Sequence, residues 1–223
     1  MPDKYIAPSV TSALHTKRIS NYAGNNSEVY IRPDLRAISQ WLHPQATVLD
    51  LGCGDGQLLT LLIKEHRVTG YGIEINDAKV LSCVQKGIHV LQQNLEEGLA
   101  LFEDQSFDFV ILSQTLQTVH HTEHLLQEIM RVGKECIVSF PNFGHWAHRL
   151  AVLRGRMPVS SFLPYQWYET PNVRVLTIAD FEALAQTTGF TLLDRLVLHR
   201  NQVIRYWPNL FGSLAVYRIR RAI

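Results

Sequence analysis

The sequence has few cysteines, and they form no recognisable set. Cys53, Cys83 and Cys136 are odd in number and far apart, and no C-x-x-C motif occurs. This pattern excludes a disulfide framework and a zinc knuckle as the basis of the fold. We therefore expect a reducing, cytoplasmic setting.

An excess of charge of one sign is also missing. The net charge of +1 gives no general reason to expect nucleic acid or an anionic membrane as a partner. No apolar run approaches the roughly 20 residues that would span a bilayer. The first residues are not expected to be a signal peptide, because no long apolar segment follows their basic residues.

What is present is enough apolar sequence for a core, in an alternating order. The chain has 223 residues, of which 46% are hydrophobic, and this favours one α/β domain with an extension. Strands are expected at 47–51, 67–75, 88–92, 107–112, 135–140, 190–198 and 214–219. Helices are expected at 32–42, 57–65, 77–86, from 122 onward and at 177–188. Because strands alternate with helices, most of the sheet should be parallel.

The prediction is thus a seven-stranded, mostly parallel sheet with helices on both faces, in a Rossmann-like α/β fold. The last two strands should form an antiparallel pair at one edge. Residues 1–31 read as an N-terminal extension, either a disordered arm or a lid in which Tyr22 or Tyr30 touches a ligand. Residues 32–223 form the domain, and residues 141–176 form an aromatic-rich insertion without clear regular structure.

The most informative stretch is the glycine loop that follows the first predicted strand. Val48–Leu51 is apolar apart from Asp50, and Gly52, Gly54 and Gly56 alternate immediately after it. Glycine can turn sharply and lets a ligand approach the backbone closely. The N–H groups at the start of the next helix can also receive an electronegative group. The loop reads G-x-G-x-G, which differs from the G-x-G-x-x-G motif of dinucleotide folds.

A second acid, Glu74, ends the next apolar run, 22 positions after Gly52. That spacing is close to the roughly 20 expected of a ribose-binding carboxylate. The loop and the acid together resemble the class I S-adenosylmethionine (SAM) methyltransferase superfamily. An NAD site and a ligand-free turn are the alternatives for the loop, and a surface acid capping the next helix is the alternative for Glu74.

The superfamily resemblance implies a set of ligand contacts. Asp50 would lie near the methionine part of SAM or S-adenosylhomocysteine, the glycine loop under it, and Glu74 at the ribose. Asn94 and Leu95 would lie at the adenine. Many relatives have Asp in place of Asn94, and a simple turn residue is the alternative there. The full set of expected cofactor-binding residues is Asp50, Gly52, Cys53, Gly54, Gly56, Glu74, Ile75, Asn94, Leu95, Ser113 and Gln114.

No single residue stands out as a catalytic base. Gln114 ends the fourth strand, where a methyl acceptor would lie, and His120 and His145 are candidates because imidazole can take a proton near neutral pH. The alternatives are that His120 is solvated beside a helix capped by Thr122, and that the segment around His145 only anchors a loop. His120 and His124 have a spacing seen in metal sites, but no third ligand is apparent, so no metal is expected.

Several further segments are similar to one narrow family, the methionine-biosynthesis protein MetW. They lie within about residues 32–220 and are 32–35, 48–59, 70–74, 140–146, 155–159, 162–165 and 207–210. The resemblance implies a SAM-binding protein that works alongside a homoserine O-acyltransferase, as its partner or regulator, and that senses SAM. An active SAM-dependent small-molecule methyltransferase is the alternative, so whether the chain is an enzyme stays open.

The insertion at 141–176 combines six aromatic residues with three arginines that precede its first acid, Glu169. Aromatic residues and arginine are enriched at interface hot spots. We therefore expect a partner-binding or substrate-covering surface, with Tyr165, Trp167 and Arg156 exposed. The alternative is that all six aromatic residues are buried over the sheet.

Overall fold

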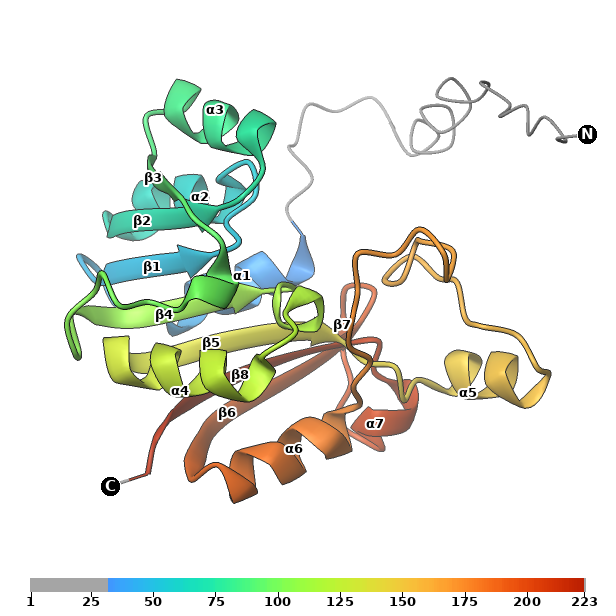
Figure 1. Ribbon diagram of the computed structural model, residues 1–223. Helices are drawn as coiled ribbons and strands as arrows, with labels where there is room; N and C mark the ends of the chain where they lie inside the picture. Colours follow the sequence, from blue (N-terminus) through green and yellow to red (C-terminus); the bar gives the residue numbers. More distant parts are fainter. Residues whose placement is uncertain (1–31, 223) are drawn as a thin grey trace, which may run out of the picture. The chain divides into compact units, whose positions relative to one another are not determined.

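The computed structural model describes residues 32–222 (Figure 1). The expected arm or lid at 1–31, with Tyr22 and Tyr30, lies outside the described residues. The elements in chain order are α1 (Pro33–Trp41), β1 (Thr47–Leu51), α2 (Gln57–His66), β2 (Thr69–Glu74), α3 (Asp77–Gln85), β3 (His89–Gln92), the 3-10 turn η2 (Leu95–Glu97), β4 (Phe107–Ser113), the 3-10 turn η3 (Leu116–Thr118), α4 (Thr122–Val132), β5 (Gly133–Pro141), α5 (Trp146–Leu153), α6 (Ile178–Thr187), β6 (Phe190–His199), β7 (Gln202–Val203), α7 (Pro208–Phe211) and β8 (Leu214–Arg221).

One sheet organises this part of the chain, with strand order β3-β2-β1-β4-β5-β8-β6-β7. Strands β1 to β5 are mutually parallel, and β8 pairs antiparallel with both β5 and β6. The order reverses between β1 and β4, so the carboxyl ends of β1 to β4 flank a crevice. Open α/β sheets bind their ligands at such a switch point.

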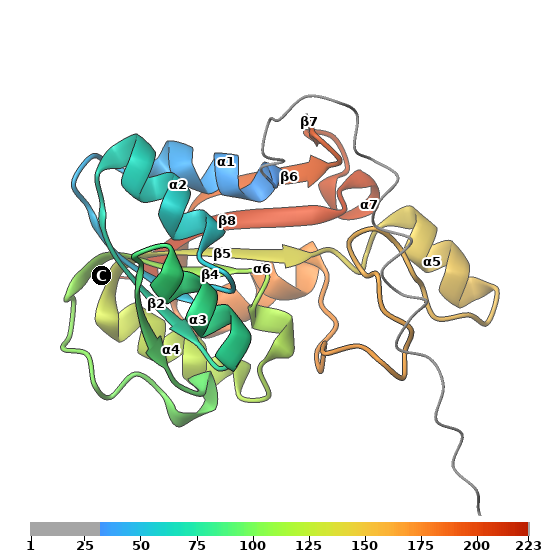
Figure 2. The same ribbon diagram turned by 90° about the horizontal axis from the view of Figure 1, so that it is seen from above.

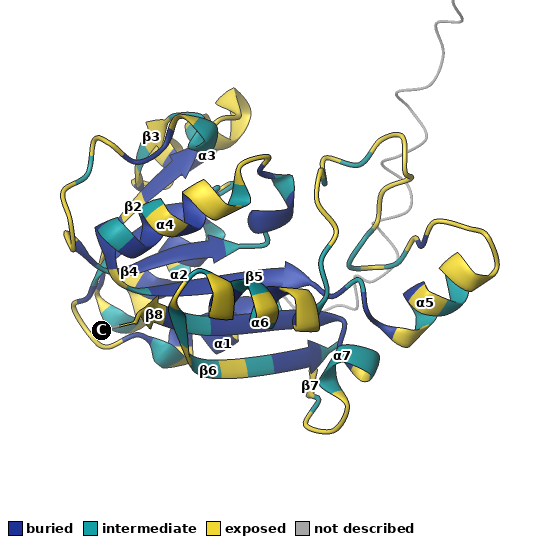
Figure 3. Cartoon of the chain, turned by 60° about the horizontal axis from the view of Figure 1, so that its bottom comes forward, coloured by how far each residue is buried: buried dark blue, intermediate teal, exposed yellow. Residues whose placement is uncertain are grey.

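Helices cover both faces of the sheet, as the alternating sequence predicts. Helices α1 and α2 lie on one face and α4 and α6 on the other (Figures 1 and 2). The inner strands are buried along most of their length (Figure 3). On the α4 and α6 face, Leu126 and Ile129 of α4 and Phe181 of α6 belong to one apolar cluster with Val138 and Phe140 of β5. Burial of these faces supplies the main driving force for folding.

The predicted α/β fold is confirmed, with differences in detail. The sheet has eight strands because a two-residue strand, β7, pairs with the end of β6. The expected antiparallel pair, β6 and β8, is present, but β8 lies inside the sheet between β5 and β6. The second strand begins at Thr69, two residues later than expected, because Arg67 takes a left-handed conformation that ends α2.

The insertion contains regular structure that the sequence pattern did not indicate. Helix α5 occupies 146–153, and its N-cap is His145, whose side chain accepts the Ala147 N–H. The expectation that all of 141–176 lacks regular structure is therefore wrong. The four-residue helix α7 was also not expected, since Pro208 at its start reads as a turn residue.

A buried amide holds the base of the insertion. The Nδ2 group of Asn142 donates to the Asn209 carbonyl at 3.1 Å and to the Gly212 carbonyl at 2.7 Å. Its Oδ1 atom accepts the N–H groups of Gly144 at 3.0 Å and Ile178 at 3.3 Å. One side chain thus connects the end of β5 to α6 and α7.

Replacing this amide should be costly. In Asn142→Ala, four buried backbone groups lose their partner, and each unsatisfied group costs on the order of 1–3 kcal/mol before relaxation. We expect a loss of unfolding free energy of roughly 2–4 kcal/mol in urea denaturation. The matched control is Asn201→Ala, at an exposed residue, which should change the unfolding free energy by less than about 0.5 kcal/mol. Equal stability of the two variants would contradict this role of Asn142.

Candidate functional site

A cavity of about 850 Å³ opens at the carboxyl edge of the sheet. The ends of β1, β2, β3 and β4 contribute to its wall, and the start of α1 and residues 161–172 complete it. Of the predicted binding residues, the cavity is lined by Asp50, Gly52, Cys53, Gly54, Glu74, Ile75, Asn94, Leu95, Ser113 and Gln114. The parallel strands therefore bring together residues that are up to 64 positions apart in the sequence.

Two glycines of the loop have separate reasons for lacking a side chain. A Cβ atom on Gly52 would lie 2.6 Å from Thr115 Oγ1, so the loop and the residues after β4 pack too closely for any other residue. Gly54 has a left-handed φ of +60°, and apart from its chain neighbours no atom of the described residues lies within 4 Å of where its Cβ would be. The space above Gly54 is therefore open cavity. Gly56 begins α2 and does not line the cavity.

Glu74 is buried at the cavity wall and organises the loops around it. Its Oε2 atom accepts the Gly54 N–H at 3.0 Å. Its Oε1 atom accepts the N–H groups of Ile75 and Asn76, both at 2.9 Å. The side chain thus holds the glycine loop against the start of α3, and Oε2 has room to accept a further hydrogen bond.

Asp50 is the most unusual group of the site. It is buried, and its Oδ1 atom has no hydrogen-bond partner among residues 32–222. Burial raises its pKa to about 7; the charge of Arg32 opposes this rise, while the charges of Glu74 and Asp34 add to it. An unsatisfied buried carboxylate is costly, so a cationic or hydrogen-bond-donating group in the cavity would be strongly favoured beside it.

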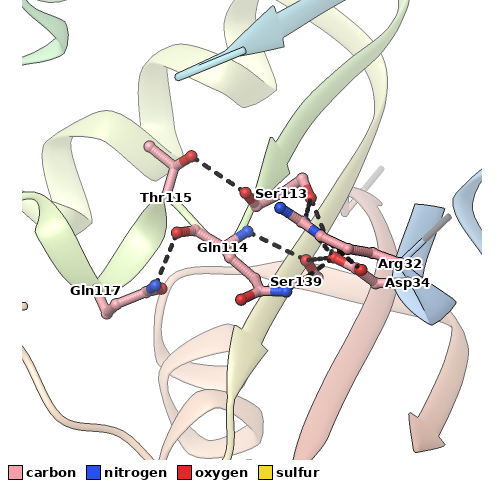
Figure 4. Close-up of polar contacts among 7 residues, drawn as sticks. All are labelled: Arg32, Asp34, Ser113, Gln114, Thr115, Gln117 and Ser139. Atoms are coloured by element: carbon pink, nitrogen blue, oxygen red, sulfur yellow. Dashed lines mark hydrogen bonds and ion pairs between the residues drawn. The ribbon is translucent and has the colours of Figure 1, made fainter. Parts of the chain in front are cut away.

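A second carboxylate, Asp34, is fully buried but fully paired (Figure 4). Arg32 donates to it through Nε at 3.1 Å and Nη2 at 2.6 Å. Ser113, Gln114 and Ser139 donate to its Oδ2 atom at 3.1 to 3.2 Å. Burial alone would raise the pKa of Asp34, but these hydrogen bonds and the Arg32 charge outweigh burial and hold the pKa below its usual value.

This network fixes the end of β4, where Ser113 and Gln114 line the cavity. Gln114 has a left-handed φ of +57°, and its N–H donates to the Ser139 carbonyl at 2.9 Å. The Gln114 carbonyl in turn accepts the side-chain amide of Gln117 at 2.7 Å. The Gln114 side chain is thus engaged by Asp34, so in this conformation it is a positioned hydrogen-bonding group with no capacity to act as a base.

The wall beyond β3 is polar. Asn94 Oδ1 accepts the Glu96 N–H at 3.0 Å, which caps η2, and the residue also faces the cavity. Glu96 accepts the backbone N–H of His120, and its Oε1 atom lies 3.3 Å from His120 Nδ1. His120 is therefore at the cavity rim, exposed and held by an acid. Helix α4 begins at Thr122 with His121 at its N-cap, one residue earlier than expected.

His145 lies outside the cavity. It is buried beside the insertion, and its ring stacks on His199 with centroids 4.9 Å apart. Burial, with smaller contributions from the neighbouring His199 and His148, lowers its pKa to about 4. His145 is thus a neutral, enclosed imidazole that caps α5, which is a structural role. This agrees with the alternative that the segment around His145 anchors a loop.

Sequence reasoning missed Arg32 and Asp34. The available signal was the spacing of Asp34, Ile38 and Trp41, which places Asp34 on the same face of α1 as apolar residues and so predicts a buried acid. Phe162 and Tyr165 line the cavity as well; they belong to the insertion expected to bind a partner or cover a substrate, but neither was among the expected cofactor-binding residues. Within residues 32–222, no three His, Cys, Asp or Glu side chains are grouped to hold a metal ion, and no helix is long and apolar enough to cross a membrane.

Comparison with known proteins gives the family. The family model described as "Methionine biosynthesis protein MetW" matches residues 32–219. The chain belongs to the MetW family. A MetW-containing relative from Rhodopirellula baltica, named bifunctional methionine biosynthesis protein MetXA/MetW, is 38% identical over 209 residues, which cover 87% of this chain and 34% of that protein.

Two other relatives agree with the methyltransferase fold. A demethylmenaquinone methyltransferase from Lactobacillus johnsonii is 28% identical over 63% of this chain and 59% of its own length. The structure of a SAM-dependent methyltransferase from Thermotoga maritima has a TM-score of 0.62 at 21% identity, covering 85% of this chain and 87% of that chain. The MetW chain thus spans about a third and about three fifths of the two curated relatives.

The raised pKa of Asp50 gives a testable dependence of stability on pH. The folded state binds the Asp50 proton more tightly than the unfolded state, whose carboxyl has the ordinary value of 3.8. The unfolding free energy of the ligand-free protein should therefore fall as pH rises from about 4 to about 7. Asp50→Asn removes this loss, so it should be more stable than wild type at pH 8 by roughly 1–4 kcal/mol, with the difference shrinking toward pH 5.

Thermal melts at pH 5 and pH 8 measure this effect. Asp55→Asn is the matched control in the same loop, because Asp55 forms only a surface ion pair with Lys86. This substitution should change the unfolding free energy by less than about 1 kcal/mol. A wild type that is more stable than Asp50→Asn at pH 8 would contradict the account.

Proposed function

We propose that this MetW-family protein binds SAM, or S-adenosylhomocysteine, and acts as the partner or regulator of a homoserine O-acyltransferase in methionine biosynthesis. The observation that carries the SAM part is the cavity in which unpartnered Asp50, the open space above Gly54 and the carboxylate of Glu74 lie together. These residues fit the group that the fold family binds.

The charges of the cavity favour SAM over a dinucleotide. Asp50 and Glu74 place two carboxylates in the wall, and the nearby Arg32 is already paired with Asp34. SAM carries an ammonium and a sulfonium, whereas the pyrophosphate of NAD is anionic and would meet two carboxylates. Like charges at a buried site are strongly unfavourable, which argues against the NAD alternative.

Each wall has a suitable role in this proposal. The Asp50 carboxylate would accept a donor from the methionine part of the ligand, and Glu74 Oε2 would accept a ribose hydroxyl. Asn94 and Leu95 would flank adenine, and Gly52, Cys53 and Gly54 would pass beneath the ligand. Burial raises the pKa of the Cys53 thiol well above its usual range, so Cys53 contributes a neutral surface.

The partner role is supported by the Rhodopirellula relative, whose name joins MetXA and MetW in one bifunctional chain. Two functions carried on one polypeptide in one organism are commonly carried by associating chains in another. We take the MetXA part to be the homoserine O-acyltransferase. Because SAM is formed downstream of methionine, a SAM-binding partner would give the pathway a sensor of its product.

A second candidate is methyl transfer to a small molecule. The cavity extends past Gln114 to Phe162 and Tyr165, and His120 stands at its rim. Space next to the ligand and an imidazole are what such a reaction needs. His120 is, however, held by Glu96, and the Gln114 side chain is engaged by Asp34. The partner role is therefore preferred.

The first test is ligand binding. SAM should bind more tightly than NAD, and Glu74→Gln should weaken SAM binding by roughly 1.5–3 kcal/mol, the scale of a charge-assisted hydrogen bond. Gly54→Val should abolish binding while the domain stays folded, since its side chain would enter the cavity at a left-handed φ. Calorimetry with SAM, with melting temperature as the check on folding, measures both. Undiminished affinity in both variants would remove these residues from the site.

The second test is the acyltransferase reaction. Homoserine O-acyltransferase from the same genome should be more active with this protein than without it, and SAM should change that activity. Parallel assay of S-adenosylhomocysteine release in the presence of homoserine and its acyl ester tests methyl transfer. Acyltransferase activity that is independent of this protein, together with S-adenosylhomocysteine release, would favour the methyltransferase candidate.

A further inference from the structure

Helix α5 is apolar but has little to pack against. Its sequence is WAHRLAVL, and of its eight residues only His148 is buried. Trp146 and Val152 are each 49% exposed and Leu153 is 84% exposed. The helix stands away from the sheet at one end of the domain (Figures 1 and 3). Contiguous exposed apolar surface of this kind marks an interaction site.

The chain that follows α5 folds back along it and leaves a groove of about 460 Å³. The α5 side of this groove has the small residues Ala147 and Ala151 together with the buried His148, and the returning chain adds the apolar residues Met157, Pro158 and Val159. Arg154 and Arg156 flank it. The groove can therefore accept an apolar side chain, with two guanidinium groups beside it.

Two chain segments at this end of the domain carry charge of one sign. Residues 142–168 and 196–213 contain five arginines but no Asp, Glu or Lys. The five are Arg149, Arg154, Arg156, Arg200 and Arg205. All five are exposed, and none makes an ion pair within the described part of the chain. A protein that is nearly neutral as a whole thus gathers unpaired positive charge at this end.

The two segments are in contact at their base. Asn142 donates to the carbonyls of Asn209 and Gly212, and His145 stacks on His199. The 196–213 segment adds Tyr206, which is 85% exposed, and Trp207, which is 71% exposed. Three of the four tryptophans in the chain lie in these two segments.

We propose that the groove between α5 and residues 154–160 is the docking site for an acidic face of the homoserine O-acyltransferase that inserts an apolar side chain. This inference rests on the proposed function, which supplies the identity of the partner. Arg154 and Arg156 would pair with carboxylates of the acyltransferase around the inserted side chain. Trp207 and Tyr206 would contact the edge of the acyltransferase interface.

The composition of the surface favours a protein over other anionic partners. Protein interfaces are enriched in Arg, Trp and Tyr and depleted in Lys, which matches five arginines and no lysine. A second copy of the chain pairing through the same patch would place arginines against arginines. Residues 1–31 carry three basic and two acidic residues, so they offer no complementary charge either.

The test uses the full chain and the purified homoserine O-acyltransferase of the same genome, with binding measured by calorimetry and by stimulation of acyl transfer. Arg154→Glu/Arg156→Glu should weaken binding about tenfold or more, because opposite charges are replaced by like charges. Ala151→Phe should also weaken binding by filling the groove. Both variants should keep the wild-type melting temperature and SAM affinity, since neither position lines the SAM cavity.

Arg220→Glu/Arg221→Glu is the matched control, with the same change of charge at the opposite end of β8. It should bind like wild type. If wild type neither binds nor stimulates the acyltransferase, the proposed function fails and this inference fails with it. If wild type binds and both groove variants bind equally well, the proposed function stands and the groove is overturned as the docking site.

Two alternatives for the same surface have their own readouts. Wild type can be mixed with vesicles of phosphatidylglycerol, and its self-association can be followed by sedimentation. Vesicle binding or self-association that the Arg154→Glu/Arg156→Glu variant loses, with acyltransferase binding unchanged, would overturn the proposal. Loss of acyltransferase binding alone supports it.

Discussion

The ion pair between the partly exposed Arg32 and the buried Asp34 is the interaction on which the site depends. Asp34 is fully buried and accepts five hydrogen bonds, from the first described residue and from the ends of β4 and β5. Removing Arg32 would leave the buried Asp34 carboxylate with neutral hydrogen-bond donors only, which is costly for a charge out of contact with water. The pair therefore holds the start of α1 against the two strands whose ends form the cavity wall.

Local sequence patterns were sufficient to predict which residues at the ends of β1 and β2 line the cavity. The glycine loop and Glu74 each lie directly at a strand end, and parallel strands bring their carboxyl ends together whatever the details of packing. The hydrogen-bond partners of Asp34 could not be predicted in this way. Ser139, for example, is 105 positions away in the sequence, and no local pattern connects the two residues. Helix α5 was missed for a different reason: it has only eight residues and lies in a segment rich in aromatic residues and proline, which reads as irregular.

The difference between local and long-range information also explains why His120 and His145 have different surroundings in the structure. His120 and His145 are alike in the sequence, since each follows a strand end and stands near aromatic or histidine neighbours. The structure separates them through contacts made by distant segments. Glu96 holds His120 at the cavity rim, whereas His199 covers His145. Residue type suggests what a side chain can do, but only tertiary packing decides whether it faces the cavity.

The cavity proposed to bind SAM and the proposed docking groove share a segment of chain. His148 of α5 lies with Nε2 at 3.1 Å from Ser160 Oγ, Ser160 lines the groove, and the next residues, Ser161 and Phe162, line the cavity. A ligand that orders Ser161 and Phe162 would therefore act on one wall of the groove. Coupling between two binding sites is reciprocal, so a protein that reports SAM to an acyltransferase must also bind SAM with a different affinity when the acyltransferase is docked. Two ligands that meet through one short segment satisfy that requirement without any rearrangement of the sheet.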